Sequence, residues 1–439
     1  MLKVVKFGGS SLASSEQFAR VKAIVEADSD RRVVVVSAPG KRFKDDTKVT
    51  DLLYICHAHI KYHASFHDVF EQIADRYREI CRGCGLTQDL EAELALVEES
   101  MNAASSVDEI VSRGEYLNAK LMAEYLGYTF IDSKDWLRFN YDGRVDFESS
   151  YEALQSLFAH AKQVVLPGFY GAFPDGEIKT FSRGGSDVTG AIAAAALDAD
   201  AYENWTDVSG ILMADPRIVD NPRPIEQVTF GELRELSYMG ADVLHEETVF
   251  PVRSKNIPLY IKNTNDPAAR GTLILEEFER ETEDEKRRFV TGITGRKHYS
   301  IITVSKARMN EEPGFIRNTL KIVEKYGITV EHIPSSIDSF SFVVSTRKIE
   351  PCLHDMMEEM NDVLHPDRIK VDHGISLIAI VGRRMAWNVG VSGKLFATLG
   401  ENNINIRMIE QGADEINIII GVADKDFKKS IRVLYDSFT

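Results

Sequence analysis

The chain has 439 residues, of which 44% are hydrophobic and 27% charged, and its formal net charge is -16. These are ordinary values for a globular protein, and the length predicts two or three domains. The acidic balance and the lack of a long Lys/Arg cluster argue against a nucleic acid partner, and no apolar stretch of about 18 residues is present to span a bilayer. We therefore expect a cytoplasmic protein.

The first predicted element is a strand over residues 2–7, whose branched and apolar residues are typical of a buried strand. It carries Lys6 and runs directly into Gly8-Gly9-Ser10-Ser11, before a helix near residues 14–27. Bare glycine backbone ahead of a helix leaves N–H groups free. The turn is therefore a natural seat for an anion such as phosphate.

Strand-like runs then alternate with helical stretches. The runs are 33–38, 129–132, 163–169, 201–206 and 258–262. This alternation predicts an α/β fold with a mostly parallel sheet covered by helices on both faces. Residues 52–126 look almost wholly helical and predict a helical lobe, and the nearly all-charged stretch at 276–288 predicts a boundary or a solvated helix.

The cysteines and histidines of the lobe raise the question of a metal site. Cys81 and Cys84 form a CxxC, and His59, His63 and His67 recur every four residues, which would place three imidazoles on one helical face. The four cysteines of the chain, which include Cys56 and Cys352, do not make a disulfide framework. A solvated helix that ends in a glycine turn explains the same residues, so we predict no metal.

Two more polar turns follow predicted strands. Ser182-Arg183-Gly184-Gly185-Ser186-Asp187 precedes an alanine-rich stretch that must be a buried helix. Capping by Ser186 or Asp187 would explain the hydroxyl and the carboxylate, but it does not require Arg-Gly-Gly. The turn 205–211 precedes Ala214-Asp215-Pro216-Arg217. Open α/β sheets bind ligands at such strand ends, and the chain has neither a Walker A pattern nor GxGxxG.

Beyond the charged stretch the chain repeats itself at a constant offset of 76 residues. Residues 313–333 overlay 389–409, with Gly314 on Gly390 and Val323 on Leu399. Each copy reads as strand, glycine turn, amphipathic helix, short turn and strand, followed by more strand. The pattern predicts two βαββαβ units, and paired small domains behind an enzyme-sized domain suggest regulation.

An ordered set of motifs is more specific than any of these features alone. The set comprises KFGGSS, SRGE at 112–115, PGF at 167–169, SRGGSD at 182–187, TDVSGI followed by ADPR, VLH at 243–245 and the doubled C-terminal module. In this order, across essentially all of the chain, it resembles the aspartokinases of the amino acid kinase family, whose tail units are ACT domains.

The resemblance implies a domain organisation. An amino acid kinase domain, an αβα sandwich, would cover residues 1–280. A first ferredoxin-like ACT domain would cover 290–372 and a second 373–439. Relatives insert the first ACT unit into the second, which makes 290–297 a candidate strand of the second.

The implied reaction is transfer of the γ-phosphoryl group of ATP to the side-chain carboxylate of L-aspartate, giving 4-phospho-L-aspartate and ADP. This is the first step towards lysine, threonine and methionine and is regulated by an end product. A carboxylate with a pKa near ~3.9 is already ionised at pH 7, so no Ser-His or Cys-His pair is needed, and none is seen. The obstacle is repulsion between two anions, which positive charge must offset.

The resemblance also assigns site residues. Lys6 and Asp187 would be catalytic, with Lys6 neutralising the migrating phosphoryl group and Asp187 ordering Lys6. Arg183 would grip the α-carboxylate in a bidentate manner, and Glu115 would take the α-amino group. The other aspartate contacts are Ser37, Thr50, Gly184, Gly185 and Ser186. The nucleotide contacts are Lys6, Gly8, Gly9, Ser10, Thr206, Asp207 and Arg217, with Mg²⁺ held chiefly by the phosphates and water.

Three departures from the family pattern stand out. Asp242 replaces a lysine that often contacts the nucleotide, so that contact is absent or comes from another cation such as Lys255. Met213 stands where relatives often place Tyr. Residues 41–48 form a longer segment than usual, for which we expect a mobile, charged loop that could close over substrate.

The ACT units are expected to hold an effector. The matching positions are Met309, Gly314, Phe315, Ile316, Glu331, Ser335 and Ser336, with Asn405 and Ile406 in the second copy. Glu331 could receive a cationic group, which favours lysine over threonine as the inhibitor. ACT units usually associate across subunits, so a homodimer or a dimer of dimers is expected.

Two other interpretations remain open. The fold could serve glutamate, acetylglutamate, carbamate or a nucleoside monophosphate, although the FGGSS form, the SRGE segment and the ACT pair argue against this. The chain could instead be a non-catalytic amino acid sensor. Asp242 alone favours that interpretation, whereas Lys6, Arg183, Glu115 and Asp187 together argue against it.

Overall fold

The structure is a computed structural model that describes residues 1–439 except 183, 242, 243, 245, 279–288, 384, 386–388 and 412–415, and the side chains of Glu246 and Glu247. It divides into two compact units. The first unit comprises Met1–Ile211, Pro224–Phe230 and Val243–Phe278, and the second comprises Leu212–Arg223, Gly231–Asp242 and Glu279–Thr439. Most of the charged stretch predicted as a boundary lies outside the described residues. Among the described helices, none is both long and apolar enough to cross a membrane.

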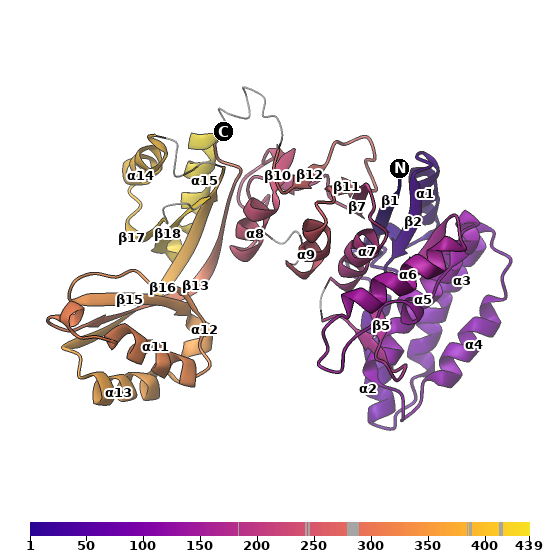
Figure 1. Cartoon of the computed structure of the whole chain (residues 1–439), viewed down its shortest axis with the longest axis horizontal. Coiled ribbons are helices and arrows are strands. Elements are labelled where there is room, and N and C mark those ends of the chain that lie inside the picture. Colours follow the sequence, from indigo (N-terminus) through magenta and orange to yellow (C-terminus); the bar gives the residue numbers. More distant parts are fainter. Residues whose placement is uncertain are drawn as a thin grey trace. The chain divides into compact units, whose positions relative to one another are not determined.

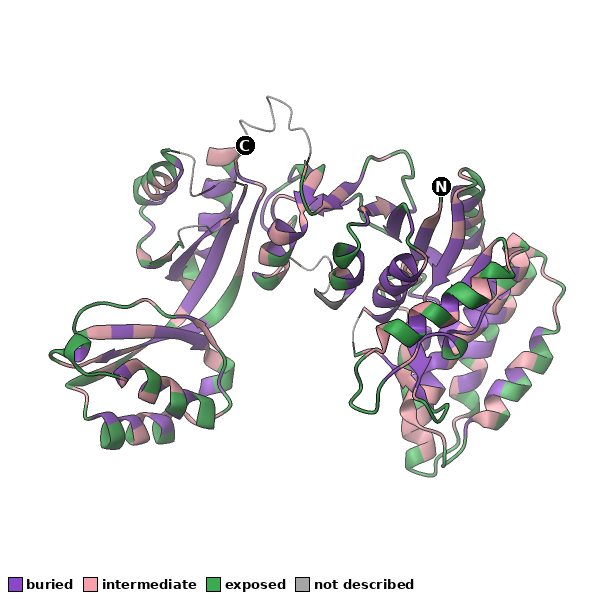
Figure 2. Cartoon of the chain, in the orientation of Figure 1, coloured by how far each residue is buried: buried purple, intermediate pink, exposed green. Residues whose placement is uncertain are grey.

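An eight-stranded sheet forms the centre of the first unit, in the order β10-β12-β11-β7-β1-β2-β4-β3 (Figure 1). Its strands are β1 (Lys3–Phe7), β2 (Arg31–Val36), β3 (Thr129–Phe130), β4 (Val164–Pro167), β7 (Ala201–Thr206), β10 (Gln227–Thr229), β11 (Leu259–Asn263) and β12 (Thr272–Leu275). Neighbouring strands are parallel except β11 with β12. The predicted mostly parallel sheet is therefore confirmed, and its central strands are buried (Figure 2).

Helices cover this sheet. They are α1 (Ser15–Glu26), α2 (Val49–Lys61), α3 (His67–Cys84), α4 (Leu90–Ser100), α5 (Val107–Leu126), α6 (Phe147–Ala159), α7 (Gly185–Ala196) and α9 (Glu246–Ser254), with the 3-10 turns η1 (Gly9–Leu12) and η2 (Ser133–Asp135). The predicted helical lobe corresponds to α2 to α5. Two small ribbons pair β5 (Tyr170–Ala172) with β6 (Ile178–Thr180) and β8 (Ile211–Leu212) with β9 (Pro224–Ile225). The helix α8 (Phe230–Tyr238) begins at the end of the first unit and continues in the second.

The alternation of side chains along β1 decides where Lys6 points. Val5 and Phe7 belong to the large apolar core that β1 and β2 share with α1 and α5. Successive side chains of a strand face opposite sides of the sheet, so Val4 and Lys6 face the other side. On that side lies α7, the predicted alanine-rich helix, whose residues 188–196 are all buried.

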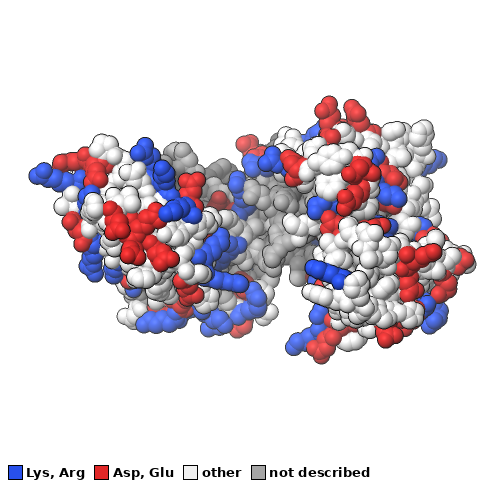
Figure 3. Space-filling view, turned by 90° about the horizontal axis from the view of Figure 1, so that it is seen from below, with Lys and Arg blue, Asp and Glu red and all other residues white. Residues whose placement is uncertain are grey.

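The second unit contains a six-stranded sheet in the order β14-β15-β13-β16-β18-β17. Its elements are β13 (Gly292–Ser305), η3 (Met309–Glu311), α11 (Phe315–Lys325), β14 (Val330–His332), β15 (Ser339–Ser345), α12 (Thr346–Ile349), α13 (Leu353–Leu364), β16 (Arg368–Val381), α14 (Val391–Glu401), β17 (Ile406–Glu410), β18 (Asn417–Ala423), η4 (Asp424–Asp426) and α15 (Phe427–Phe438). Both signs of charge are interspersed on the face that Figure 3 shows.

The sequence repeat is reproduced in the bounds of the helices. α11 and α14 have the same length, and their ends differ by the predicted offset of 76 residues. Each follows a glycine in the left-handed region, with φ of 86° at Gly314 and 93° at Gly390. The expected pair of ferredoxin-like units is confirmed, and each has its own apolar core.

The two long strands β13 and β16 run through both copies. Residues Gly292–Arg296 pair with Leu377–Val381 beside β18, whereas Tyr299–Ser305 pair with β15 and with the first part of β16. We call the copy built around α11 the first module and the copy built around α14 the second module. The chain thus contributes a strand to the second module before it builds the first.

Part of the predicted kinase domain packs into the second module. Ala214, Ile218 and Val219 join an apolar core with residues of β16, β18 and α15. The carbonyl of Ile218 accepts a hydrogen bond from Arg432 Nε at 2.6 Å, and Tyr435 Oη accepts one from the Arg223 amide at 2.9 Å. The segment Leu212–Arg223 is therefore anchored in the second unit.

The three histidines of the lobe do not lie on one helical face. α2 ends at Lys61, His63 has a positive φ of 55°, and His67 begins α3. The expectation of one face was wrong because the helix breaks between them, and His59 Nδ1 contacts the Ser65 carbonyl across that break at 2.7 Å. No group of three potential metal ligands exists among the described residues.

Candidate active site

The polar turns predicted from the sequence gather at one edge of the eight-stranded sheet. β1, β2, β4 and β7 are neighbouring parallel strands, so their carboxyl ends meet at the same edge. The turns that leave them begin at Gly8, Ser37, Gly168 and Asp207. The fold thus brings together segments that are up to two hundred positions apart in the sequence.

A cleft of about 220 Å³ opens at this edge. It is lined by Lys6, Ser37, Thr50, Glu115, Phe169, Gly184, Gly185, Ser186 and Asp187. All of these except Phe169 are residues that we predicted as catalytic or aspartate-binding. Phe169 entered the sequence analysis only as part of the PGF motif.

Lys6 and Asp187 form an ion pair in the cleft, in which Lys6 is buried and Asp187 is partly exposed. Lys6 Nζ also lies 3.4 Å from Asn204 Oδ1, and Asn204 Nδ2 donates to Asp187 Oδ1 at 2.9 Å. Asn204 stands beside Lys6 in the register of β1 and β7. The sequence analysis missed Asn204, although a polar residue inside the buried strand 201–206 was a usable signal.

The N-terminus of α7 faces the cleft through Gly184, Gly185 and Ser186. Gly184 is the N-cap residue and has a left-handed φ of 56°, so neither Ser186 nor Asp187 caps the helix and that alternative is wrong. A Cβ atom at Gly185 would lie 2.9 Å from Phe169 Cα, which explains the glycine. The free amides and the positive end of the helix dipole suit an anionic ligand.

Glu115 is a carboxylate without a full set of partners. It belongs to α5 and is 5% exposed, and within the described part of the chain its Oε2 atom has no hydrogen-bond partner. Burial raises its pKa to about 8, although a hydrogen bond from the Ala38 amide opposes the shift. A buried acceptor of this kind favours a ligand that brings a positive charge.

The two glycines after β1 make different contacts. The Gly8 amide donates to the Trp205 carbonyl at 3.0 Å, so this N–H is already engaged and is not the free donor that we expected. A Cβ atom at Gly9 would lie 2.8 Å from the Ala38 carbonyl oxygen and 3.1 Å from the Gly40 nitrogen. Gly9 is therefore needed where two loops touch, and it is the remaining backbone donor candidate of the pair.

The predicted nucleotide residues are less closely gathered. Thr206 ends β7, its hydroxyl lies 3.3 Å from Asp207 Oδ1, and Ser10 lies in η1. Arg217 belongs to the second unit, is mostly exposed and pairs with Asp215 at 2.8 Å. Arg217 is thus not among the residues that the cleft brings together.

Three other positions bear on the charge of the site. Arg183 and Asp242 lie outside the described residues. Lys255, considered as a substitute cation, pairs with Asp198 at 2.8 Å beyond the C-terminus of α7. The cleft lies at the N-terminus of α7, and a helix of this length spans about 18 Å, so Lys255 is at the wrong end.

The predicted effector positions lie in the first module, at Met309 to Ser336, and at the start of β17. Met309 and Phe315 are buried in the core of the first module, so their side chains serve packing. Gly314 is the N-cap of α11, and Ile316 lines an open groove along that helix. Ser335 and Ser336 lie in the turn before β15, where the Ser336 amide donates to the Ser339 carbonyl at 2.8 Å. Asn405 and Ile406 lie at the start of β17, the strand of the second module that corresponds to β14.

Glu331 is already in contact with another residue of the second unit. On β14 its Oε2 atom accepts a hydrogen bond from the Tyr238 hydroxyl. Burial, followed by this carboxylate, raises the pKa of Tyr238 above its ordinary value. An effector's cationic group would therefore compete with Tyr238 for Glu331.

Comparison with known families identifies both parts of the chain. Residues 1–263 match the model of the amino acid kinase family, and residues 378–438 match an ACT domain. Aspartokinase 3 of Bacillus subtilis is 38% identical over an alignment of 452 positions that covers 100% of this chain and 98% of that protein.

Solved structures give the same result. The crystal structure of aspartate kinase from Clostridium acetobutylicum has a TM-score of 0.90 and 45% identity, and the match covers 100% of both chains. Aspartokinase III of E. coli, in complex with aspartate and ADP, has a TM-score of 0.76 and 26% identity over 100% of this chain and 99% of that one. In complex with lysine and aspartate the same enzyme has a TM-score of 0.74 and 27% identity over the same shares.

Proposed function

The chain belongs to the aspartokinases of the amino acid kinase family, and from this premise we propose which of its residues perform the reaction. It is an ATP-dependent kinase that phosphorylates the side-chain carboxylate of L-aspartate, giving 4-phospho-L-aspartate and ADP. The observation that carries the proposal is the single cleft that Lys6, Glu115, Asp187 and the start of α7 line together.

Lys6 acts on the phosphoryl group during transfer. The nucleophile is an ionised carboxylate, so no proton has to be removed, and the main barrier is repulsion between two anions. Asp187 and Asn204 hold the ammonium of Lys6 at the base of the cleft. A cation that its neighbours already hold in place stabilises the spreading negative charge without reorganising as the reaction proceeds.

Aspartate binds between α5 and the start of α7. The Glu115 oxygen Oε2, which has no hydrogen-bond partner among the described residues, accepts the α-ammonium, and this contact draws the proton off a group whose pKa is otherwise raised to about 8. The α-carboxylate lies at the amides of Gly185 and Ser186, with Arg183 as its proposed guanidinium partner. The hydroxyls of Ser37 and Thr50 line the same cleft and orient the reacting carboxylate.

ATP approaches from the turns after β1 and β7, where we assign Gly9, Ser10, Thr206 and Asp207 to it. The described residues offer no cluster of three potential metal ligands, and Asp187 is engaged by Lys6 and Asn204. This chemistry fits a Mg²⁺ ion that the phosphates and water hold, and such an ion neutralises part of the phosphate charge.

Regulation is assigned to the paired modules. We propose that lysine binds the first module near Glu331 and inhibits the enzyme, because the Glu331 carboxylate can accept the side-chain ammonium of lysine. We also propose that the modules associate across subunits of a homodimer or dimer of dimers, and that the enzyme works in the cytoplasm.

Trapping the acyl phosphate tests the reaction and the proposed roles together. With MgATP and hydroxylamine, we expect a hydroxamate from aspartate and a near-background signal from glutamate. Glu115→Ala should lose aspartate turnover and leave the Lys6–Asp187 pair intact. Equal turnover of both acids would contradict the proposed aspartate contacts.

A further inference from the structure

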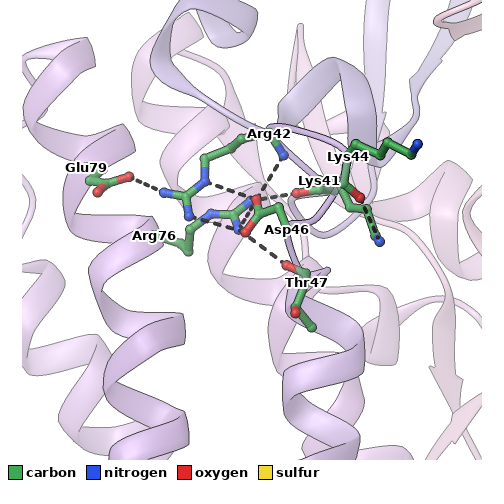
Figure 4. Close-up of polar contacts among 8 residues, drawn as sticks. Lys41, Arg42, Lys44, Asp46, Thr47, Arg76 and Glu79 are labelled. Atoms are coloured by element: carbon green, nitrogen blue, oxygen red, sulfur yellow. Dashed lines mark hydrogen bonds and ion pairs between the residues drawn. The ribbon is translucent and has the colours of Figure 1, made fainter.

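The segment between β2 and α2 connects two residues of the cleft. Ser37 follows β2 directly, and Thr50 is the second residue of α2. We expected residues 41–48 within this segment to form a mobile loop. The structure instead ties the loop to α3 through a network of ion pairs and hydrogen bonds (Figure 4).

Arg76 on α3 is the centre of this network. It is 4% exposed, and its guanidinium donates to the Gly40 carbonyl at 2.5 Å, to Asp46 Oδ2 at 2.8 Å and to the Thr47 carbonyl at 3.3 Å. One planar group therefore joins the beginning and the end of the loop. A lysine ammonium lacks the fixed fork that such a set of acceptors requires.

Asp46 gives Arg76 a permanent partner. The carboxylate also accepts from the backbone amide of Arg42 at 2.9 Å and from Arg42 Nε at 3.0 Å, and Arg42 pairs with Glu79 of α3 at 2.7 Å. Burial alone would raise the pKa of Asp46, but the hydrogen bonds from Arg42 and the charge of Arg76 lower it to about 2. The carboxylate is therefore ionised wherever the enzyme works.

The two ends of the loop differ in how much they depend on Arg76. Ser37 has its own supports, because its amide donates to the Phe7 carbonyl at 3.2 Å and its carbonyl accepts from Asn118 Nδ2 at 2.6 Å. Thr50, by contrast, is the second residue of α2, and Lys48, the N-cap residue of that helix, makes no side-chain capping hydrogen bond.

The backbone supports of the Thr50 end lie within the clamped loop. The Val49 amide donates to the Pro39 carbonyl at 3.2 Å, and Pro39 directly precedes the Gly40 carbonyl that Arg76 holds. The Thr47 carbonyl is itself a partner of Arg76. Arg76 thus holds the start of α2 through both of these contacts, in addition to the burial of Val49 in the apolar core.

The same contact presses the loop against the turn after Lys6. The Gly40 amide donates to the Gly9 carbonyl at 2.8 Å while the Gly40 carbonyl accepts from Arg76. A Cβ atom at Gly40 would lie 2.6 Å from the Gly9 carbonyl carbon. Gly9 has further support from its neighbours, because the Gly8 amide and the Ser11 hydroxyl bond to Trp205 and Thr264.

We propose that Arg76 is a positioning residue for phosphoryl transfer, which fixes the Thr50 hydroxyl in the cleft by clamping the Gly40 and Thr47 carbonyls. The inference rests on the proposed function, in which Thr50 contacts aspartate. Arg76 itself touches no substrate, and its loss leaves Lys6 and Glu115 on their own elements. The KM for aspartate therefore rises more than the KM for ATP.

Steady-state kinetics of Arg76→Met and Arg76→Lys, with Arg78→Gln as control, test this. We expect the KM for aspartate to rise about tenfold or more in both Arg76 variants, since a misplacement of about 1 Å can cost up to 10²-fold, while the KM for ATP stays within about twofold. Arg78 lies on the same helix and pairs with Glu71, Asp75 and Glu91 away from the loop. Arg78→Gln should therefore keep the wild-type KM values for aspartate and ATP.

A double-mutant cycle with Thr50→Val gives the sharper result. The proposal has Arg76 act through Thr50. The KM for aspartate of Arg76→Met/Thr50→Val should therefore be no higher than that of the more impaired single variant. Fully additive losses, or an equal rise in KM in Arg78→Gln, would overturn the proposal. A lower kcat with both KM values unchanged, which is the result expected from a general loss of folding, would also overturn it.

Hydrogen exchange measures the clamp without turnover. In Arg76→Lys and Asp46→Asn, the amides of residues 40–50 should exchange faster while those of α5 keep their wild-type rates. Unchanged exchange of the loop in both variants would refute the clamp. If wild-type enzyme fails to phosphorylate aspartate, the proposed function falls, but hydrogen exchange still decides whether Arg76 holds the loop.

Discussion

The cleft of the first unit and the paired modules of the second are built by opposite means. The cleft consists mainly of charged groups, hydroxyls and bare backbone, and among the described residues one of its buried carboxylate oxygens has no hydrogen-bond partner. The modules are held by apolar strands and by two helices that repeat at a fixed offset. The difference teaches that polar groups without a full set of hydrogen bonds are available to bind a ligand, whereas fully buried apolar side chains stabilise the fold.

Replacing Lys6 by alanine should have the largest effect, because it removes the cation that we place on the transferring phosphoryl group. We expect kcat to fall by about 10² to 10⁴-fold, as for loss of a preorganised group that stabilises transition-state charge. Lys3→Ala is the matched control on the same strand, since Lys3 pairs with Asp28 at 2.6 Å outside the cleft. Similar losses in the two variants, measured by hydroxamate formation, would mean that Lys6 acts only through stability.

Truncating Leu395 to alanine tests the apolar side of the comparison. Leu395 is fully buried on α14, and we expect the free energy of unfolding of the second unit to fall by about 2 to 5 kcal/mol. Its counterpart in the repeat is Thr319, also buried, whose hydroxyl donates to the Phe315 carbonyl at 3.1 Å. Thr319→Ala should cost only about 1 kcal/mol in urea unfolding. Equal losses would show that the modules do not depend on apolar burial at this site.

Glu115→Gln separates binding from stability. The pKa of Glu115 is raised in the folded protein, so between about pH 4.3 and pH 8 the folded chain holds a proton that the unfolded chain has released. The free energy of unfolding of the empty enzyme therefore falls as pH rises through this window. The glutamine variant should lose this slope and be more stable at pH 8 by about 1 to 3 kcal/mol.

Aspartate should oppose this loss of stability at higher pH in the wild-type enzyme. Its ammonium favours the ionised Glu115, so saturating aspartate should raise the unfolding midpoint of the wild type and leave that of Glu115→Gln unchanged. A variant with the wild-type pH slope, or one that aspartate still stabilises, would contradict the role given to Glu115.

The smallest expected effect concerns Glu331 and Tyr238. Glu331→Gln should weaken inhibition by lysine about fivefold to tenfold, which corresponds to roughly 1 to 1.4 kcal/mol. Tyr238→Phe should strengthen inhibition, because it removes the hydroxyl that occupies Glu331. Glu324→Gln, on the exposed face of α11, is the control for the loss of a charge. Inhibition curves that coincide for all three variants would place the effector elsewhere.

Local patterns were sufficient to predict most of the fold. The strand before Gly8, the alanine-rich helix that became α7 and the repeat that became α11 and α14 each carry a complete signal within about twenty residues. Such signals report hydrophobic periodicity, which the final packing retained. The histidines of the lobe show where such a signal fails, because their four-residue spacing continues through the break between α2 and α3.

The site was predictable where a motif carried it and not where tertiary contacts created it. Lys6, Glu115 and Asp187 came from motifs. Asn204 and Arg76 did not, since each gains its importance from a partner that the fold brings close, namely Lys6 beside β7 and the loop beside α3. A local pattern cannot report how far a charged loop is tied down.

The shared strands β13 and β16 also delay the formation of one strand pair during protein synthesis. Residues Gly292–Arg296 leave the ribosome first, yet their partners Leu377–Val381 follow about 85 residues later, which takes roughly 4 to 17 s at 5–20 residues per second. The first module can close during that delay, while the waiting strand shows unpaired amides to its surroundings. Nascent chains should therefore be most prone to mispairing just before residue 381 emerges.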